Sequence, residues 1–102
     1  MSIKKTFLPD KGVCRVLFSL PEGIDNPTKK VAIAGDFNNW NPEVNFMKMT
    51  KAGKFHCKVD LLAGREYQFR YLLDNIRWVT DWDADGLIIS PDSGTYNSLI
   101  KL

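Results

Sequence analysis

Apolar and polar residues alternate with a period of two along several stretches of this chain. From Phe55 to Leu61, Phe, Cys, Val and Leu alternate with His, Lys and Asp, and Tyr67 to Leu73 repeats the pattern with Tyr, Phe, Tyr and Leu. Successive side chains of a strand point to opposite faces, so this period indicates strands with one buried face. Helical periodicity is absent over any useful length. The chain is therefore expected to be all-β.

Gly, Pro, Asn and Asp interrupt the alternation about every eight to twelve residues, a spacing typical of the turns of an all-β sandwich. About seven or eight strands are expected, and two packed sheets would bury the odd-numbered faces of 55–61 and 67–73 together. The chain of 102 residues is long enough for one domain with one core. We expect a single domain over 1–102, with 1–12 as an N-terminal extension or edge strand. The clearest strand patterns are Val13 to Leu20, Val31 to Gly35, Asn45 to Thr50, Phe55 to Leu61, Tyr67 to Leu73, Arg77 to Thr80 and Thr95 to Leu102.

Composition argues against several classes of function. The 14 basic and 12 acidic residues give a net charge of +2, a balance too even for nucleic-acid binding by electrostatics alone. No stretch is long or apolar enough to cross a membrane, and the N-terminal sequence MSIKKTFLPDKG lacks the apolar run of a secretory signal. We therefore expect a cytoplasmic protein that binds neither nucleic acid nor membrane.

The cysteines and the single histidine do not form a recognisable catalytic or metal site. Cys14 and Cys57 occupy inward positions of alternating stretches, where buried, reduced thiols are expected; a disulfide between them stays open as an alternative if their strands are neighbours. His56 faces away from Cys57, so it has no nucleophile within reach, and a zinc site needs about four ligands. We expect no enzymatic activity and no cofactor.

The acidic segment DWDADGLIISPD has the spacing of a calcium-binding loop. Asp81, Asp83 and Asp85 stand at alternate positions before Gly86, and Asp92 takes the twelfth position. However, both flanks have strand patterns in place of helices, and the last ligand is Asp after a proline where Glu is usual. The favoured interpretation is a polar loop whose carboxylates cap turns and stay in water, with a calcium site as the alternative.

Three tryptophans lie outside the inward positions of the alternating stretches. Trp40 is in AGDFNNWNP, Trp78 follows DNIR, and Trp82 is in the acidic loop. An aromatic face can stack on the C–H face of a sugar while nearby polar groups bind its hydroxyls, as in other sites with an apolar platform and a few aimed polar groups. Arg70 lies between two inward aromatic residues, so it points to the outer face. Each tryptophan alone fits a packing role, but the group indicates a ligand-binding surface.

Three segments carry a resemblance to a known family, over about Val13 to Leu102: VAIAGDFNNWNP, KFHCKVDLLAGREYQFRYLLDNIRWVTDWDAD and GTYNSLIKL. They are similar to the early-set, immunoglobulin-like domain at the front of isoamylases and glycogen branching enzymes, and to the glycogen-binding domain of the AMP-activated protein kinase beta subunit. These domains form family 48 of the carbohydrate-binding modules. The resemblance implies an immunoglobulin-like β-sandwich that binds α-1,4-linked glucans without catalysing a reaction.

The resemblance also implies which residues contact the glucan. Trp40 and Trp78 match the two stacking tryptophans of the family. Arg70 matches a basic position, usually Lys, that hydrogen-bonds sugar hydroxyls. Thr95 and Asn97 match a polar pair near the C-terminal strand. These five residues form the predicted carbohydrate site.

Three departures from the family pattern concern this site. Ser93 stands where the kinase domain has a leucine that reaches through the curved sugar chain, and Trp82 has no counterpart there. We keep both as second-tier contacts. At position 70, the planar guanidinium of Arg stands where the family usually has the compact ammonium of Lys, so the geometry of the hydrogen-bond donors differs.

Two functions of different classes remain. The leading one is binding of an α-glucan polysaccharide or maltooligosaccharide. The alternative is a protein-interaction or scaffold module, whose exposed aromatic residues dock a glucan-processing enzyme or a second copy of the chain, with weak or no sugar binding.

Three residues of the segment AGDFNNWNP are expected to have different roles. Gly35 is expected to supply turn freedom or a close backbone approach, and Phe37 to anchor the turn to the core. This leaves Trp40 available to a ligand.

Overall fold

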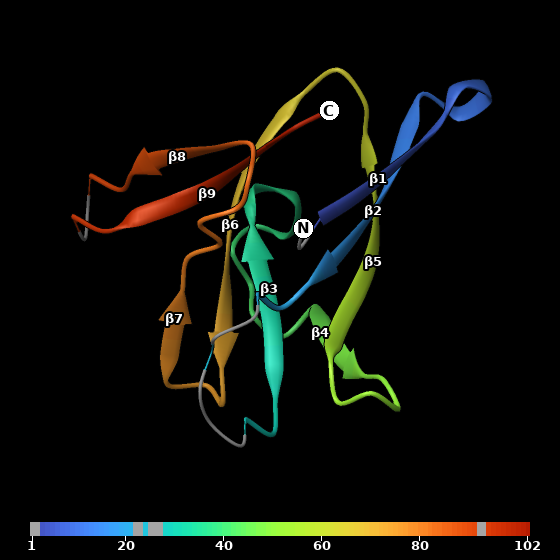
Figure 1. Cartoon of the computed structure of the whole chain (residues 1–102). Coiled ribbons are helices and arrows are strands. Elements are labelled where there is room, and N and C mark those ends of the chain that lie inside the picture. The colour runs from blue at the N-terminus through green and yellow to red at the C-terminus, as the bar shows by residue number, and fades with distance from the viewer. Residues whose placement is uncertain (1–2, 22–23, 25–27, 92–93) are drawn as a thin grey trace.

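The chain folds as an immunoglobulin-like β-sandwich, which confirms the predicted all-β class (Figure 1). The computed structural model describes residues 3–21, 24, 28–91 and 94–102. All seven of the clearest strand patterns form strands. Strand β1 lies within 1–12, for which an edge strand was one of the two expectations, and β8 was not expected. The strands are β1 Ile3–Leu8, β2 Val13–Ser19, β3 Val31–Gly35, β4 Asn45–Met49, β5 Phe55–Leu62, β6 Glu66–Leu73, β7 Arg77–Val79, β8 Gly86–Ile89 and β9 Tyr96–Lys101, with single 3-10 turns at η1 Pro9–Lys11 and η2 Asp36–Asn38.

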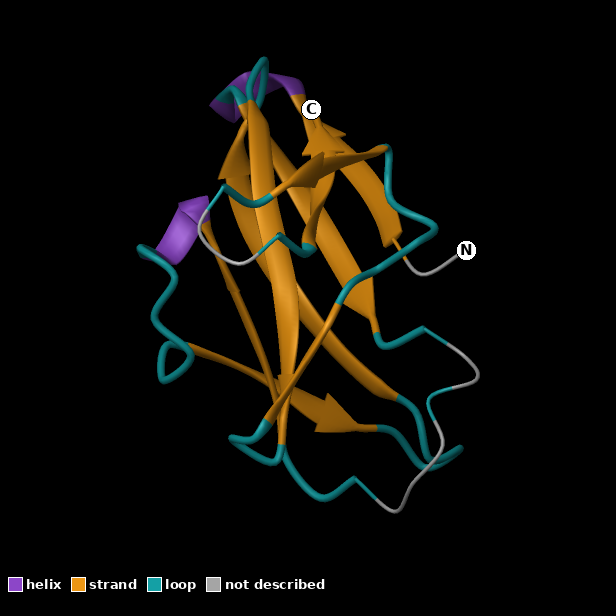
Figure 2. Ribbon diagram, turned by 90° about the vertical axis from the view of Figure 1, so that its left-hand side faces the viewer, coloured by secondary structure: helices purple, strands orange, loops and turns teal. Residues whose placement is uncertain are grey.

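The strands form one antiparallel sheet that curls into two layers. Its order is β1-β2-β5-β4-β3-β6-β9-β8, with β7 paired to β6. Strand β4 pairs with both β3 and β5, so it carries the sheet from one layer to the other. Figure 2 shows the described chain as long stacked strands joined by loops and two short helical turns. Neither of these three-residue turns has the length or apolar character of a membrane-spanning helix.

The core lies between the inward faces of the two layers, as the alternation predicted. Phe55 and Leu61 of β5 belong to the same buried cluster as Phe69 and Tyr71 of β6. Burying a large apolar side chain contributes about 1.5–3 kcal/mol, so this face supplies much of the driving force for folding. The fully buried cluster members are Cys14, Val16, Phe18, Val31, Ile33, Phe69, Tyr71 and Ile100.

Both cysteines are free thiols on neighbouring strands. The register of β2 and β5 sets Cys14 opposite Leu61 and Cys57 opposite Phe18. The two cysteines are thus four residues apart along the strand direction, about 13 Å. A disulfide needs Cα atoms within about 7 Å, so the register favours the reduced thiols that were predicted.

The acidic loop between β7 and β8 differs from the prediction of solvated carboxylates, because Asp81 is fully buried. Its Oδ2 accepts a hydrogen bond of 3.0 Å from the Tyr71 hydroxyl, and its Oδ1 accepts one of 3.0 Å from the backbone N–H of Asp83. The backbone N–H of Asp81 donates to the Ser98 hydroxyl at 2.7 Å. Since an unpaired buried polar group costs about 1–3 kcal/mol, this network fixes the loop to the core.

Asp85 ties the same loop to the first strand. Its Oδ2 lies 2.6 Å from the Lys5 ammonium of β1 and accepts a 2.8 Å hydrogen bond from the backbone N–H of Lys101. Burial raises the pKa of Asp85, but the Lys101 N–H and the Lys5 ammonium outweigh it and hold this pKa below its ordinary value. The contact joins β1, at one end of the sheet, to β9 near the other end.

Because of Tyr71, the folded protein is expected to lose stability at alkaline pH. Burial, followed by the negative charge and hydrogen bond of Asp81, raises the pKa of Tyr71 well above its usual value. The folded state then holds this proton more tightly than the unfolded state. Stability contributed by Tyr71 is therefore complete below about pH 10 and lost as the pH rises above it. Urea unfolding between pH 7 and 11 should show this fall, with a shallower slope for Tyr71→Phe. Equal slopes for the two proteins would contradict it.

Candidate functional site

The segment after β3 is shaped by the side chain of Asn38. Its Oδ1 accepts a 3.0 Å hydrogen bond from the backbone N–H of Gly35, and its Nδ2 donates to the Ile33 carbonyl at 3.0 Å and to Asn45 Oδ1 at 2.8 Å. These bonds hold η2 against the ends of β3 and β4. Short polar side chains favour such local backbone contacts, which explains why Asn follows Phe in this turn.

Gly35 is required for close packing and not for turn freedom. Its φ of −172° is ordinary extended backbone. A Cβ at this position would lie 2.4 Å from the carbonyl oxygen of Gln68 and 2.8 Å from Cβ of Phe69. Of the two predicted roles, the close backbone approach is therefore the correct one.

Phe37 anchors the turn, as predicted. Its ring packs against the core, with its centroid 5.9 Å from that of Phe18 and 6.3 Å from that of Tyr67. The aromatic contacts fix η2 over one end of the sandwich. The chain then continues into Trp40, which is only half-buried.

Trp40 and its neighbour have a backbone conformation that L-residues avoid. Asn39 has a φ of 57° and Trp40 a φ of 58°. Asn tolerates the left-handed region, but a bulky residue there is a genuine outlier. The backbone N–H of Trp40 donates to the carbonyl of Gly35 at 2.9 Å. This reversal brings the indole back over the sheet.

A second tight turn places Trp78 on the same face. Asp74 and Asn75 have φ values of 52° and 61°, and the Ile76 N–H donates to the Leu73 carbonyl at 3.0 Å, which is a type I′ turn between β6 and β7. The register sets Trp78 opposite Leu72 of β6.

Leu72 and Arg70 are two residues apart on one strand, so they share the outer face. Because Trp78 pairs with Leu72, it lies on the same outer face, beside Arg70.

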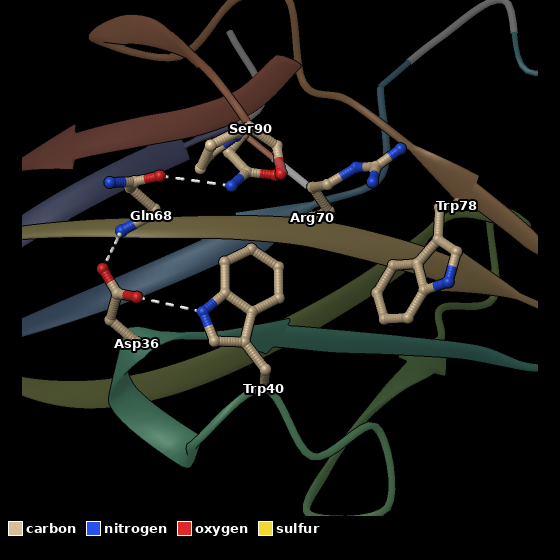
Figure 3. A pocket seen from close by; sticks show the side chains of 8 residues that line it. Asp36, Trp40, Gln68, Arg70, Trp78 and Ser90 are labelled. Carbon is tan, nitrogen blue, oxygen red and sulfur yellow. Dashed lines mark hydrogen bonds between the residues drawn. The ribbon is translucent and has the colours of Figure 1, made fainter. Parts of the chain in front are cut away.

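A pocket of about 360 Å³ lies on this outer face (Figure 3). Its walls come from separate parts of the chain: the η2 segment, β6, β7, the segment after β8, and β9. The volume is in the range of small-molecule sites. The lining residues are Asp36, Trp40, Gln68, Arg70, Trp78, Ser90, Pro91 and Asn97.

Arg70 is the central cation of the pocket. Its Cζ lies 5.7 Å from the centroid of the Trp78 ring, which is a cation–π contact. Burial lowers the pKa of Arg70, although a guanidinium stays charged at neutral pH. Its Nε is buried and has no hydrogen-bond partner within the described part of the chain. The guanidinium is held by stacking, with hydrogen-bonding capacity left unused.

Two further hydrogen-bonded links order the polar side of the pocket. Asp36 accepts from the Trp40 indole N–H at 2.9 Å and from the Gln68 backbone N–H at 2.8 Å. Asn97 Nδ2 donates to Gln68 Oε1 at 3.1 Å. Figure 3 shows the two indoles next to each other, with the Arg70 side chain above them in the view. The arrangement presents two aromatic faces, one cation and neutral amides around one pocket.

Four of the five residues predicted for the first tier line this pocket. These are Trp40, Arg70, Trp78 and Asn97. Thr95 is exposed in the turn between β8 and β9, where its carbonyl accepts from the Ser90 N–H at 2.7 Å, and it is absent from the described lining. The prediction missed Asp36, Gln68, Ser90 and Pro91. Gln68 had a usable signal, because it is two residues before Arg70 on the same strand face.

The second-tier residues and the acidic cluster lie elsewhere. Trp82 is 66% exposed and contacts Tyr96 edge-on, with ring centroids 5.5 Å apart. Tyr96 precedes Asn97 on β9, so it faces the side opposite the pocket. Ser93 and Asp92 lie outside the described residues.

The three described carboxylates of the alternative calcium loop, Asp81, Asp83 and Asp85, are not grouped around one point. Asp81 points into the core and Asp85 contacts Lys5. Among the described residues, no three His, Cys, Asp or Glu side chains are grouped to hold a metal ion.

The chain matches one family profile, described as the glycogen recognition site of AMP-activated protein kinase, over residues 24–102. This region contains β3 to β9 and every residue of the pocket, whereas β1 and β2 precede it. The predicted resemblance to the kinase glycogen-binding domain is confirmed. No curated protein matches the chain.

Proposed function

The chain belongs to the family of the glycogen recognition site of AMP-activated protein kinase, and from this we propose that it binds α-1,4-linked glucans through Trp40, Trp78, Arg70 and Asn97. The observation that carries the proposal is the pocket itself. It gathers two indoles, one guanidinium and the Asn97 amide from four separate segments onto one outer face.

The chemistry of the pocket suits a glucan chain better than a small charged ligand. Aromatic faces stack on the C–H faces of glucosyl rings, and amide and guanidinium groups bind the hydroxyls at ring edges. Trp78 is 39% exposed and Trp40 half-buried, so both present surface to a ligand. A shallow surface site buries little area, so we expect dissociation constants of about micromolar to millimolar.

We further propose that the protein is not an enzyme. Glycoside hydrolysis uses a pair of carboxyl groups across the scissile bond. Asp36 is the one carboxylate among the described lining residues, and both of its oxygens already accept hydrogen bonds from the protein. The partners of the protein would be a polysaccharide or maltooligosaccharide and, in the cytoplasm, a glucan-processing enzyme that acts on the same glucan.

Titration of intrinsic tryptophan fluorescence with a linear maltooligosaccharide tests the proposal. We expect a saturable change for the unmodified protein. Arg70→Ala should weaken binding by about tenfold or more, since it removes charged hydrogen bonds and the support of Trp78. Arg70→Lys should fall between the two, because an ammonium keeps the charge without the planar fork.

Two controls accompany this titration. A β-1,4-linked oligosaccharide should give no comparable response. Arg15→Ala should bind normally, because Arg15 lies on the other layer of the sandwich. There its Nε is 2.9 Å from Asp60 Oδ1. A flat titration with the maltooligosaccharide, or equal binding by Arg70→Ala, would overturn the proposed site.

Strand β8 supports protein interaction as a second candidate function. It is the last strand in the sheet order and carries exposed apolar side chains, with Ile89 at 59%. Trp82 and Tyr96 add exposed aromatic surface nearby. Contiguous exposed apolar surface often marks an interface. A flat sugar titration together with a dimer in size-exclusion chromatography would favour this second function over the first.

A further inference from the structure

We infer that Asp36 is a positioning residue that holds the indole of Trp40 in the orientation needed for stacking on a sugar; the inference rests on the proposed function. The resemblance to glucan-binding domains gave no role to this residue. Asp36 does not need to touch the ligand in order to act. It determines where one of the two aromatic faces of the pocket points.

The carboxylate of Asp36 bridges two separate segments of the chain. Oδ1 accepts from Trp40 Nε1 at 2.9 Å, and Oδ2 accepts from the backbone N–H of Gln68 at 2.8 Å. Hydrogen bonds to a carboxylate are shorter and about twice as strong as neutral ones. Asp36 thus connects the turn that carries Trp40 to β6, the strand that carries Arg70 (Figure 3).

The bond to Trp40 has a geometry that preserves the binding face. An indole N–H lies in the plane of the ring at its edge. A hydrogen bond there restricts rotation of the ring while both of its faces stay free of the acceptor. A packing contact on the face would hold the ring equally well, but it would occupy the surface that a sugar needs.

The backbone of the turn gives this restraint its importance. Trp40 has a φ of 58°, directly after Asn39 at 57°, and a left-handed residue other than glycine is disfavoured by about 1–2 kcal/mol. The Trp40 N–H to Gly35 carbonyl bond of 2.9 Å supports the backbone. It does not fix the torsions of the side chain, so the indole depends on Asp36 for its orientation.

A carboxylate is the side chain that this position requires. Two N–H donors converge on it, and an ionised carboxyl group offers an acceptor to each. Asparagine has one acceptor oxygen and one amide nitrogen. In Asp36→Asn the oxygen can therefore accept from one N–H donor, but the amide NH2 group would point at the other donor. Asp36→Ala removes both acceptors.

The first test follows the indole directly, without any sugar. The chain has three tryptophans, and Trp40→Phe assigns the indole ¹H–¹⁵N resonance that disappears. In Asp36→Ala this resonance should shift and exchange faster with solvent, while the other two stay in place. Asp60→Ala is the matched control, since Asp60 is an exposed carboxylate that pairs with Arg15 on the other layer. An unmoved Trp40 resonance in Asp36→Ala would overturn the inference.

The second test measures the maltooligosaccharide affinity of the same variants. Asp36→Ala should bind about tenfold more weakly, as expected for loss of a charged hydrogen bond, and Asp36→Asn should lose less. Trp40→Phe keeps a ring but has no N–H, so adding Asp36→Ala to it should cost much less than in the unmodified protein.

The outcomes separate this inference from the proposed function. If Trp40→Ala abolishes binding while folded Asp36→Ala and Asp36→Asn bind normally, the function stands and the positioning role fails. If the unmodified protein binds no maltooligosaccharide, the proposed function fails, and the indole resonance still decides whether Asp36 orients Trp40. Thermal unfolding of each variant shows that the comparison is between folded proteins.

Discussion

Gly35→Ala is expected to reduce the free energy of unfolding by about 3 kcal/mol or more, the upper range for overpacking a buried site. The added Cβ would lie 2.4 Å from the Gln68 carbonyl oxygen and 2.8 Å from Phe69 Cβ. Both atoms belong to β6, whose pairing with β3 is fixed by the ladder. Relief would require the two strands to move apart, because neither neighbour is the end of a flexible side chain. Urea denaturation monitored by circular dichroism measures this change.

Gly86→Ala is the matched control for this substitution. Its nearest neighbour would be Leu99 Cδ2 at 3.3 Å, the end of a side chain that can adjust. We expect a change of about 1 kcal/mol or less, as for most substitutions without a specific packing conflict. Equal stability of the Gly35→Ala and Gly86→Ala proteins would show that the contact between β3 and β6 is not as close as described.

The fold could be predicted because alternation reports directly on which face of a strand is buried. Odd positions from Phe55 to Leu61 and from Tyr67 to Leu73 contribute to one core, as period-two patterning requires. Strand β8 escaped prediction for the same reason. Leu87, Ile88 and Ile89 are three consecutive apolar residues, all exposed, so they show no alternation.

The acidic loop was misjudged because its partners are distant in the sequence. Two hydrogen-bond partners that hold Asp81 in the core lie far along the chain: the Tyr71 hydroxyl, ten residues away, donates to its carboxylate, and the Ser98 hydroxyl, seventeen residues away, accepts from its backbone N–H. Nothing in the DxDxDG spacing encodes those partners. A carboxylate without them would have stayed in water, as buried charges require pairing.

The residues of the candidate site also differ in whether the sequence could predict them. Alternation alone placed Arg70 on the outer face and left Trp40 and Trp78 outside the inward positions, whereas Asn97 came from the family resemblance. Asp36 was missed because its contact with the indole depends on the left-handed backbone of Asn39 and Trp40. Composition does not predict that a tryptophan will adopt this conformation.

The combined replacement Trp40→Ala, Trp78→Ala is expected to remove glycogen binding. Truncation of an aromatic residue at the centre of a binding site commonly costs about 2 kcal/mol or more. Each single variant should therefore bind roughly tenfold to a hundredfold more weakly. Because the starting affinity of a shallow site is modest, the double variant should fall below detection.

Trp82→Ala serves as the tryptophan control for this experiment. Trp82 is 66% exposed and contacts Tyr96 on the side away from the pocket. Its loss removes one exposed indole while the pocket stays intact. Any nonspecific affinity of exposed indoles for polysaccharide would be reduced in this variant as well, so it isolates the contribution of the pocket.

Co-sedimentation with glycogen tests the central claim most directly. The account predicts that the unmodified protein and Trp82→Ala pellet with glycogen, whereas folded Trp40→Ala, Trp78→Ala stays in the supernatant. Co-sedimentation of the double variant at the level of the unmodified protein would contradict the claim that this pocket binds the glucan.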